Sequence, residues 1–256
     1  MFHFFSNKQS YLLCVTRVVK GIFLWMISTY AVAMGPFHPY ASVDVGVMNT
    51  NAKSVGTLAW ADSIGTVTNR YNSTGALGDI NLGVIKPFNR FFLGANAGYN
   101  YMNQTSRIGT NASYLGDTYY DNTYVNLKYF YSFMGQVGYS INDSSSIFFT
   151  MGGAYGQFNF GQSVKFTYLK HGISGSRSPM IWGTDVGIGL KQNITPKLAL
   201  VLTGQYIDFQ TYSESNVHAL LSKTGLNDKI SISPNVLIAK LGVEYYFDDI
   251  KATFDK

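Results

Sequence analysis

The sequence predicts an all-β fold: an eight-stranded antiparallel up-and-down transmembrane β-barrel, preceded by a cleaved signal peptide. Two observations predict it. Stretches of about ten residues alternate apolar side chains with small or polar ones, as in the hairpin between Tyr124 and Tyr155 with its turn at Asn142 and Asp143. Short turns and long polar loops then follow these stretches in strict alternation along the chain. Such regular punctuation is typical of a barrel whose neighbouring strands run up and down.

Residues 1–33 have the organisation of a secretory signal peptide. A basic segment without acidic residues precedes the apolar run GIFLWMISTYAVA, which ends in the small-x-small pattern Ala31 to Ala33. This run is shorter than the roughly 20 residues that a transmembrane helix needs. We therefore expect a signal peptide at 1–33, an outer-membrane β-barrel domain at 34–247 and a short periplasmic tail at 248–256.

Loss of this segment changes the charge and the cysteine content. It removes three basic residues and no acidic ones, so 19 basic and 14 acidic residues become 16 and 14, and the formal charge falls from +5 to +2. We therefore expect no nucleic-acid partner. The single cysteine, Cys14, also leaves, which excludes disulfides and thiolate chemistry. Many glycine and aromatic residues with only 13% charged residues fit a sheet with one apolar face.

Eight stretches carry the strand pattern. The first alternates Val43, Val45 and Val47 with small or polar residues, and the second does the same around Ile80 and Leu82. The third reads FFLGANAGYNY, the fourth and fifth form the hairpin described above, the sixth and seventh read MIWGTDVGIGLKQ and LALVLTGQYID, and the last reads VLIAKLGVEYYF. The expected bounds are Tyr40 to Met48, Leu77 to Ile85, Phe91 to Tyr101, Tyr124 to Ile141, Ser146 to Phe158, Met180 to Gln192, Leu198 to Asp208 and Val236 to Phe247.

The connections differ in a regular way. Those after the second, fourth and sixth strands are short and carry turn residues such as Pro87, Asn142 and Pro196. The other four connections are about 20 residues or longer and rich in Asn, Ser, Thr, Gly and Tyr, and structureless connections of that length are usually functional or disordered. Both termini share one end with the short turns, so the four long loops gather at the other.

The charged residues indicate which face of each strand meets lipid. When the valines of the first strand point outward, the same inside–outside alternation turns seven ionisable side chains of the strands inward. A slip of one residue would place all seven in lipid. Each basic side chain would then cost up to about 2–4 kcal/mol near the midplane. The expected lumen charge network is Asp44, Asp79, Lys128, Asp185, Lys191, Lys240 and Glu244.

The same phase places aromatic side chains outward near both ends of the strands, as expected for the two interfaces of a bilayer. The expected belt near the long loops is Tyr99, Tyr101, Tyr155, Trp182 and Tyr206, and the one near the short turns is Phe91, Tyr139, Tyr245 and Phe247.

The last strand, Val236 to Phe247, resembles the closing strand of the small eight-stranded outer-membrane barrels of Gram-negative bacteria, the group of the outer membrane protein A membrane domain and the opacity-type surface proteins. The resemblance implies a monomeric protein in the cell outer membrane, surrounded by outer-membrane lipid and lipopolysaccharide. It also implies that the assembly machinery reads Tyr245, Tyr246 and Phe247. Residues 248–256 depart from the family, whose signal often ends the chain, and they are too short for a peptidoglycan-binding domain.

Recognised catalytic signatures are absent from the sequence, so we expect no enzyme and no cofactor. A few barrels of this size are lipid A modifying enzymes, but His171 lies in a loop instead of on a strand. The lumen of an eight-stranded barrel is just wide enough for side chains. Its charges are therefore interpreted as a self-neutralising polar core, or alternatively as a gate formed by Asp44 and Lys240.

The long loops hold the remaining capacity for recognition, because Tyr-, Ser-, Gly- and Asn-rich loops on a rigid scaffold suit adaptable binding. The function expected is therefore that of a surface protein mediating adhesion or contact with a host or surface protein. A small or gated pore, a lipid A modifying enzyme and a soluble lipocalin-like carrier remain as alternatives. The candidate recognition residues are Trp60, Tyr71, Tyr119, Tyr120, Tyr168, Lys170 and Arg177.

Overall fold

The structure, a computed structural model, describes residues 37–60, 63–104, 106–114, 117–166, 172–215 and 227–249. They belong to one compact unit, Phe37–Lys256. The expected signal peptide lies outside the described residues, as does most of the expected tail. No helix able to cross a membrane occurs among the described residues. The strands are β1 (His38–Trp60), β2 (Ser63–Phe88), β3 (Phe91–Asn103), β4 (Ser106–Tyr114), β5 (Asp117–Ser140), β6 (Ser145–Phe166), β7 (Gly172–Arg177), β8 (Met180–Thr195), β9 (Leu198–Phe209), β10 (Tyr212–Ser215) and β11 (Asn227–Tyr246).

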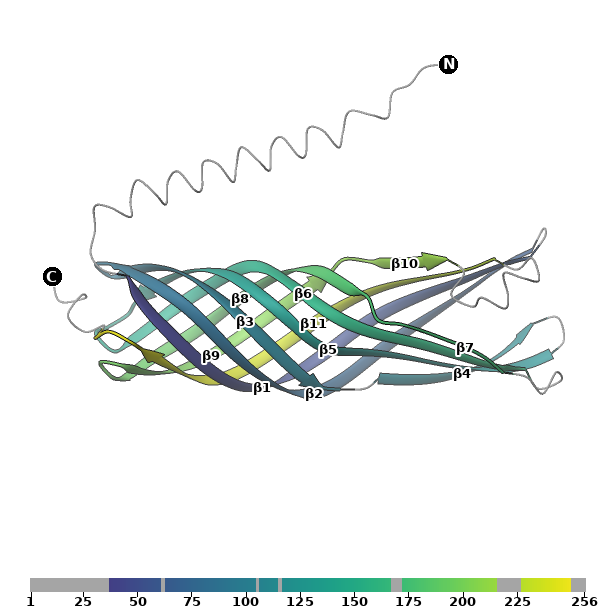
Figure 1. The fold of residues 1–256 in the computed structure, drawn as a ribbon, viewed down its shortest axis with the longest axis horizontal. Helices are drawn as coiled ribbons and strands as arrows, with labels where there is room; N and C mark the ends of the chain where they lie inside the picture. Colours follow the sequence, from purple (N-terminus) through teal and green to yellow (C-terminus); the bar gives the residue numbers. More distant parts are fainter. Residues whose placement is uncertain are drawn as a thin grey trace, which may run out of the picture. The chain divides into compact units, whose positions relative to one another are not determined.

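Eight of these strands close into an antiparallel ring (Figure 1). The order around the ring is β1, β2, β3, β5, β6, β8, β9 and β11, and β11 pairs back onto β1. The connections at one end are tight: β2 and β3 are joined through Asn89 and Arg90, and Asn89 adopts a positive φ of 56° that asparagine tolerates. The predicted fold, an up-and-down barrel of eight strands, is therefore confirmed.

The strands are much longer than the sequence predicted, which corrects the expectation of four structureless loops. β1 and β2 stay paired as far as Trp60 and Ser63, and β4 and β5 as far as Tyr114 and Asp117. β7 pairs with β6 and β10 with β11 in the same way. These extensions contain many Thr, Tyr and Val residues, which favour strands. They lack the apolar alternation that marks a lipid-facing strand, so periodicity did not reveal them.

Beyond the ring the sheet divides into two four-stranded parts. We call β10–β11–β1–β2 blade A and β4–β5–β6–β7 blade B. Pairing of β11 with β1 continues to Asn227 and Ala59, and pairing of β5 with β6 continues to Tyr119 and Phe166. In the part of the chain that the structure describes, no strand pairing joins β2 to β4 or β7 to β10. Two seams therefore separate the blades.

A β-bulge in β5 corrects the placement of Lys128. The register between β5 and β6 shifts between Leu127 and Tyr129, so one extra residue occupies this position. Val125 and Leu127 before the bulge and Phe130 after it all point inward, whereas Lys128 is exposed. The prediction that Lys128 faces the lumen is therefore wrong, because it extended one phase through a strand that changes phase.

Candidate functional site

At the short-turn end of the lumen, Lys191 lies in an aromatic cage. Its Nζ is 2.5 Å from Glu244 Oε2 and donates a hydrogen bond of 2.7 Å to the Tyr246 hydroxyl. That hydroxyl donates in turn to Glu244 Oε2 at 2.6 Å. Four ring centres lie 5.4–5.6 Å from Lys191 Nζ, within the range of cation–π attraction, and they belong to Tyr40, Phe92, Phe148 and Tyr246. The cage fills this end of the lumen with side chains.

A second buried ion pair lies further up the lumen. Lys240 Nζ is 2.5 Å from Asp79 Oδ2, and both side chains are less than a tenth exposed. Asp44 does not form the expected pair with Lys240. Its carboxylate accepts hydrogen bonds from the Ser42 hydroxyl at 3.1 Å and from Asn81 at 2.8 Å. Because Asn81 also donates to Asp79 at 2.8 Å, the two carboxylates share one amide.

The side chains around this network leave a cavity of about 40 Å³. Its lining is mostly polar and includes Gln136, Thr150 and Gln205. That volume exceeds what one water molecule requires, so the chamber can hold ordered water. Asp185 is fully buried on β8, and among the described residues neither of its carboxylate oxygens has a hydrogen-bond partner. Gly187, the next inward position after Asp185, pairs with both Thr150 and Gln205, so polar groups line this side of the lumen.

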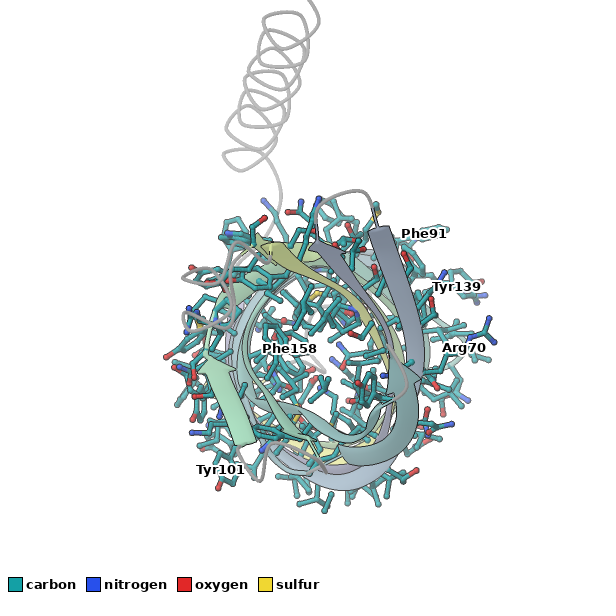
Figure 2. All side chains as sticks on the ribbon, turned by 90° about the vertical axis from the view of Figure 1, so that its right-hand side faces the viewer. Arg70, Phe91, Tyr101, Tyr139 and Phe158 are labelled. Carbon is teal, nitrogen blue, oxygen red and sulfur yellow. The ribbon has the colours of Figure 1, made fainter. Side chains whose placement is uncertain are left out.

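Towards the outer hairpins an apolar cluster fills the lumen. The Phe158 ring lies 4.9 Å from that of Phe209, and Phe130 lies 6.5 Å from Phe209. Figure 2 shows Phe158 inside the barrel, whereas Arg70, Tyr101 and Tyr139 point away from it. The buried members from all eight ring strands are Met48, Ala52, Tyr71, Leu77, Met102, Val125, Leu127, Phe130, Ala154, Phe158, Phe160, Ile181, Ile207, Phe209, Ile232, Val236 and Ile238. The polar chamber therefore lies between two side-chain layers.

The outer surface of the ring is apolar. Val45, Leu82, Ile188, Leu202 and Leu241 are each more than half exposed on it. All nine aromatic residues expected in the belts point away from the lumen, and only Tyr155 is less than about a third exposed, because it stacks on Trp182 at 4.5 Å. The aromatic residues in question are Tyr99, Tyr101, Tyr155, Trp182 and Tyr206 towards the hairpins and Phe91, Tyr139, Tyr245 and Phe247 towards the short turns.

Of the expected recognition residues, the structure describes the side chains of Tyr71 and Arg177, and these two do not share a surface. Tyr71 is only 2% exposed, because β2 continues without interruption and Tyr71 lies on the same inward face of this strand as Asp79. Its expected role in a recognition loop is therefore wrong. Arg177 is exposed on β7, and its Nε lies 2.7 Å from Glu214 Oε1 of β10, across one seam. Trp60, Tyr119 and Tyr120 lie on hairpin strands, but their side chains are not among those described, and Tyr168 and Lys170 lie outside the described residues.

Sequence reasoning missed two polar connections in the lumen. Asn81 bridges Asp44 and Asp79, and Tyr246 bridges Lys191 and Glu244. In each case the residue lies two positions from a predicted lumen carboxylate on the same strand, so alternation places it inward, but alternation within one strand does not show which groups it connects across strands. No group of three or more metal-ligating side chains lies together among the described residues.

Neither a family model nor a curated protein sequence matches this chain. Its fold is similar to that of several solved outer-membrane proteins. Ail, the attachment invasion locus protein of Yersinia pestis, shares 17% identity, with 81% of this chain and 98% of Ail covered and a TM-score of 0.37. The outer membrane protease OmpT from Escherichia coli shares 11% identity (84% and 99% covered, TM-score 0.46), and OprG from Pseudomonas aeruginosa shares 9% (83% and 98% covered, TM-score 0.43).

At these identities the likeness concerns the fold alone, and the assignment rests on the geometry of the chain itself. Eight antiparallel strands close without an edge, six ionisable side chains from the predicted network are buried inside, and the outward face is apolar between two groups of aromatic residues. The chain is thus an eight-stranded transmembrane β-barrel.

Proposed function

We propose that the protein is exported to the outer membrane of a Gram-negative bacterium, where the barrel is a closed scaffold and the outer hairpins mediate adhesion or other contact with a host or the environment. The observation that supports this most is the contrast between a lumen filled at both ends and four paired hairpins that extend well beyond the apolar band. Side chains on such hairpins are held by strand pairing, which favours recognition over transport. The proposal includes no catalytic activity and no cofactor.

Hairpin shortening tests this proposal. Replacing residues 54–69 by Asn-Gly joins Lys53 to Arg70, which already face each other, through a two-residue turn. Replacing 107–124 in the same way shortens the β4–β5 hairpin between Ser106 and Val125. Both variants should keep the heat-modifiable migration of a folded barrel, and at least one should lose adherence when expressed in a non-adherent bacterium. Unchanged adherence in both would contradict a role for these two hairpins.

A gated pore is the second candidate, because the lumen contains a polar chamber with two ion pairs. We expect no steady conductance from the wild-type protein in planar bilayers, since apolar and aromatic layers lie on both sides of the chamber. Phe158→Ala removes a fully buried ring from the outer layer and should admit transient currents. A steady single-channel current from the wild type would favour the pore over the closed scaffold.

A further inference from the structure

The outward face of blade A changes chemistry abruptly where the barrel ends. On β1, the exposed residues Val43, Val45 and Val47 are followed by Asn49, Asn51 and then Lys53, all on the same face. The β2 partners change in step, from Ala76 opposite Val47 to Thr74 opposite Asn49. The polar part of the blade therefore continues directly from the lipid-facing band.

A ladder of amides and hydroxyls covers this polar face. Asn49 donates hydrogen bonds to Asn72 at 2.7 Å and to Thr74 at 3.2 Å, and Asn51 donates to Asn49 at 2.8 Å. Beside this ladder, hydroxyl pairs at 2.7 Å join Thr211, which directly precedes β10, to Ser233 of β11, and Ser213 of β10 to Ser231 of β11. Neutral donors and acceptors of this kind suit the hydroxyl groups of a saccharide.

Two cations face each other one step beyond the amides. Lys53 is directly opposite Arg70 in the β1–β2 ladder, and both side chains are exposed. Like charges in this position are destabilising unless an anion neutralises them. Neither side chain forms an ion pair with a described residue, and Figure 2 shows Arg70 directed away from the barrel.

One further charge on the described part of the blade, Lys229, strengthens the positive field. Lys229 on β11 is exposed and lies four residues beyond Ser233, the β11 partner of Lys53. That places it roughly 13 Å further along the strand. Among the described side chains, none on the outward face of blade A is acidic; the nearest outward carboxylate in the register is Asp208, on the neighbouring strand β9 opposite Asn235.

We propose that Lys53 and Arg70 bind a phosphate of the lipopolysaccharide that surrounds the barrel, while Asn49, Asn51 and Asn72 contact its sugars. The inference rests on the proposed outer-membrane location, but not on adhesion. Arginine binds phosphate oxygens through its planar fork and lysine binds them as a point charge. The position of the pair directly above a lipid-facing surface favours a phosphorylated glycolipid of the same leaflet over a soluble anion.

Binding of lipopolysaccharide to the purified full-length protein in neutral detergent tests the site. Lys53→Gln/Arg70→Gln removes both charges and keeps most of the side-chain length. The matched control Arg90→Gln/Lys197→Gln makes the same change of charge at the short-turn end. We expect the first variant to bind phosphorylated lipopolysaccharide at least tenfold more weakly, the control to change by less than twofold, and dephosphorylated lipopolysaccharide to bind wild type and variant equally. Equal binding of the phosphorylated form to wild type and the Lys53/Arg70 variant would overturn the proposal.

Thermal unfolding is a second test, because the order of stability of wild type and variant should reverse when lipopolysaccharide is added. Without lipopolysaccharide, the Lys53/Arg70 variant should unfold at an equal or higher temperature than the wild type, because a repulsion is removed. With phosphorylated lipopolysaccharide present, the wild type should become the more stable of the two. A variant that is less stable in both conditions would mean that the two side chains stabilise the fold instead of binding an anion. Tighter binding of a soluble sulfated glycan than of lipopolysaccharide at Lys53 and Arg70 would also overturn the proposed source of the anion.

Discussion

Removal of one partner of the Lys240–Asp79 pair should destabilise the barrel strongly. Asp79→Asn keeps the size of the side chain but leaves the Lys240 ammonium without its counter-ion at 2.5 Å. The Lys240 side chain is 8% exposed and that of Asp79 is fully buried, so bulk water has little access to the unpaired ammonium. The substitution therefore exposes how much the lumen depends on charge pairing.

The expected loss of stability follows from this burial and from the nearest alternative partner of Lys240. Breaking a buried ion pair costs about 3–5 kcal/mol. Asp44 is linked to Asp79 through Asn81, so Lys240 can turn towards it, and we expect the lower figure, about 3 kcal/mol. The exposed pair of Lys197 and Asp249, 3.9 Å apart with side chains 46% and 63% exposed, is the control. Loss of that pair should cost about 0–1 kcal/mol.

Equilibrium unfolding by urea in lipid vesicles, followed by tryptophan fluorescence, measures these differences. The double variant Asp79→Asn/Lys240→Met should be more stable than Asp79→Asn alone, because it no longer buries an unpaired charge, and the double-mutant cycle isolates that coupling. The reasoning is refuted when Asp79→Asn costs no more than Lys197→Gln, or when the double variant is no more stable than the less stable single variant.

Three further predictions concern the register, the bulge and the seam. Gly46→Ala should cost about 1–3 kcal/mol, since its Cβ would collide with the Ala239 carbonyl oxygen, whereas Gly78→Ala has nothing within 4 Å and should be nearly neutral in the same unfolding assay. Deletion of Lys128 should remove the bulge and leave Leu127 and Phe130 facing inward on a regular strand, so heat-modifiable migration should persist, and Lys128→Ala should change stability by less than about 0.5 kcal/mol; a deletion variant that does not fold would argue against the bulge. Burial opposes ionisation of Glu214, but hydrogen bonds from Tyr212 and Arg177 outweigh it and hold its pKa below the ordinary value of 4.5. The contribution of Glu214 to stability is therefore present above pH 4.5 and is lost as the pH falls through the lower folded pKa. Between pH 7 and 3 the free energy of unfolding should fall more for wild type than for Glu214→Gln. The difference should be less than about 1 kcal/mol, because these groups are partly exposed.

The parts of the fold that the sequence predicted are those where lipid imposes a pattern. Next to lipid, outward residues must be apolar and charges must face inward, so Asp79, Asp185 and Glu244 could be placed from alternation alone. Water imposes no such pattern on the hairpins, and both the length of β2 and the burial of Tyr71 escaped detection. The bulge at Lys128 also escaped, because one extra residue changes the phase without a compositional signal.

Several irregularities of the sheet lie together at the outer edge of the lipid-facing band. The break between β3 and β4 at Gln104 lies beside the bulge at Lys128, and Pro179, between β7 and β8, accepts a hydrogen bond from the Phe158 amide on the next strand. In hydrocarbon every backbone donor and acceptor needs a partner, so the sheet has to stay closed there. In water its edges can be solvated, and the sheet can divide. Each seam is then bridged by side chains: Gln104 donates to the Ser73 carbonyl oxygen at 2.6 Å on one side, and Arg177 pairs with Glu214 on the other. The division into blades therefore begins where the membrane constraint on the backbone ends, and the open edges of β2, β4, β7 and β10 are confined to the part of the molecule that we assign to the aqueous exterior.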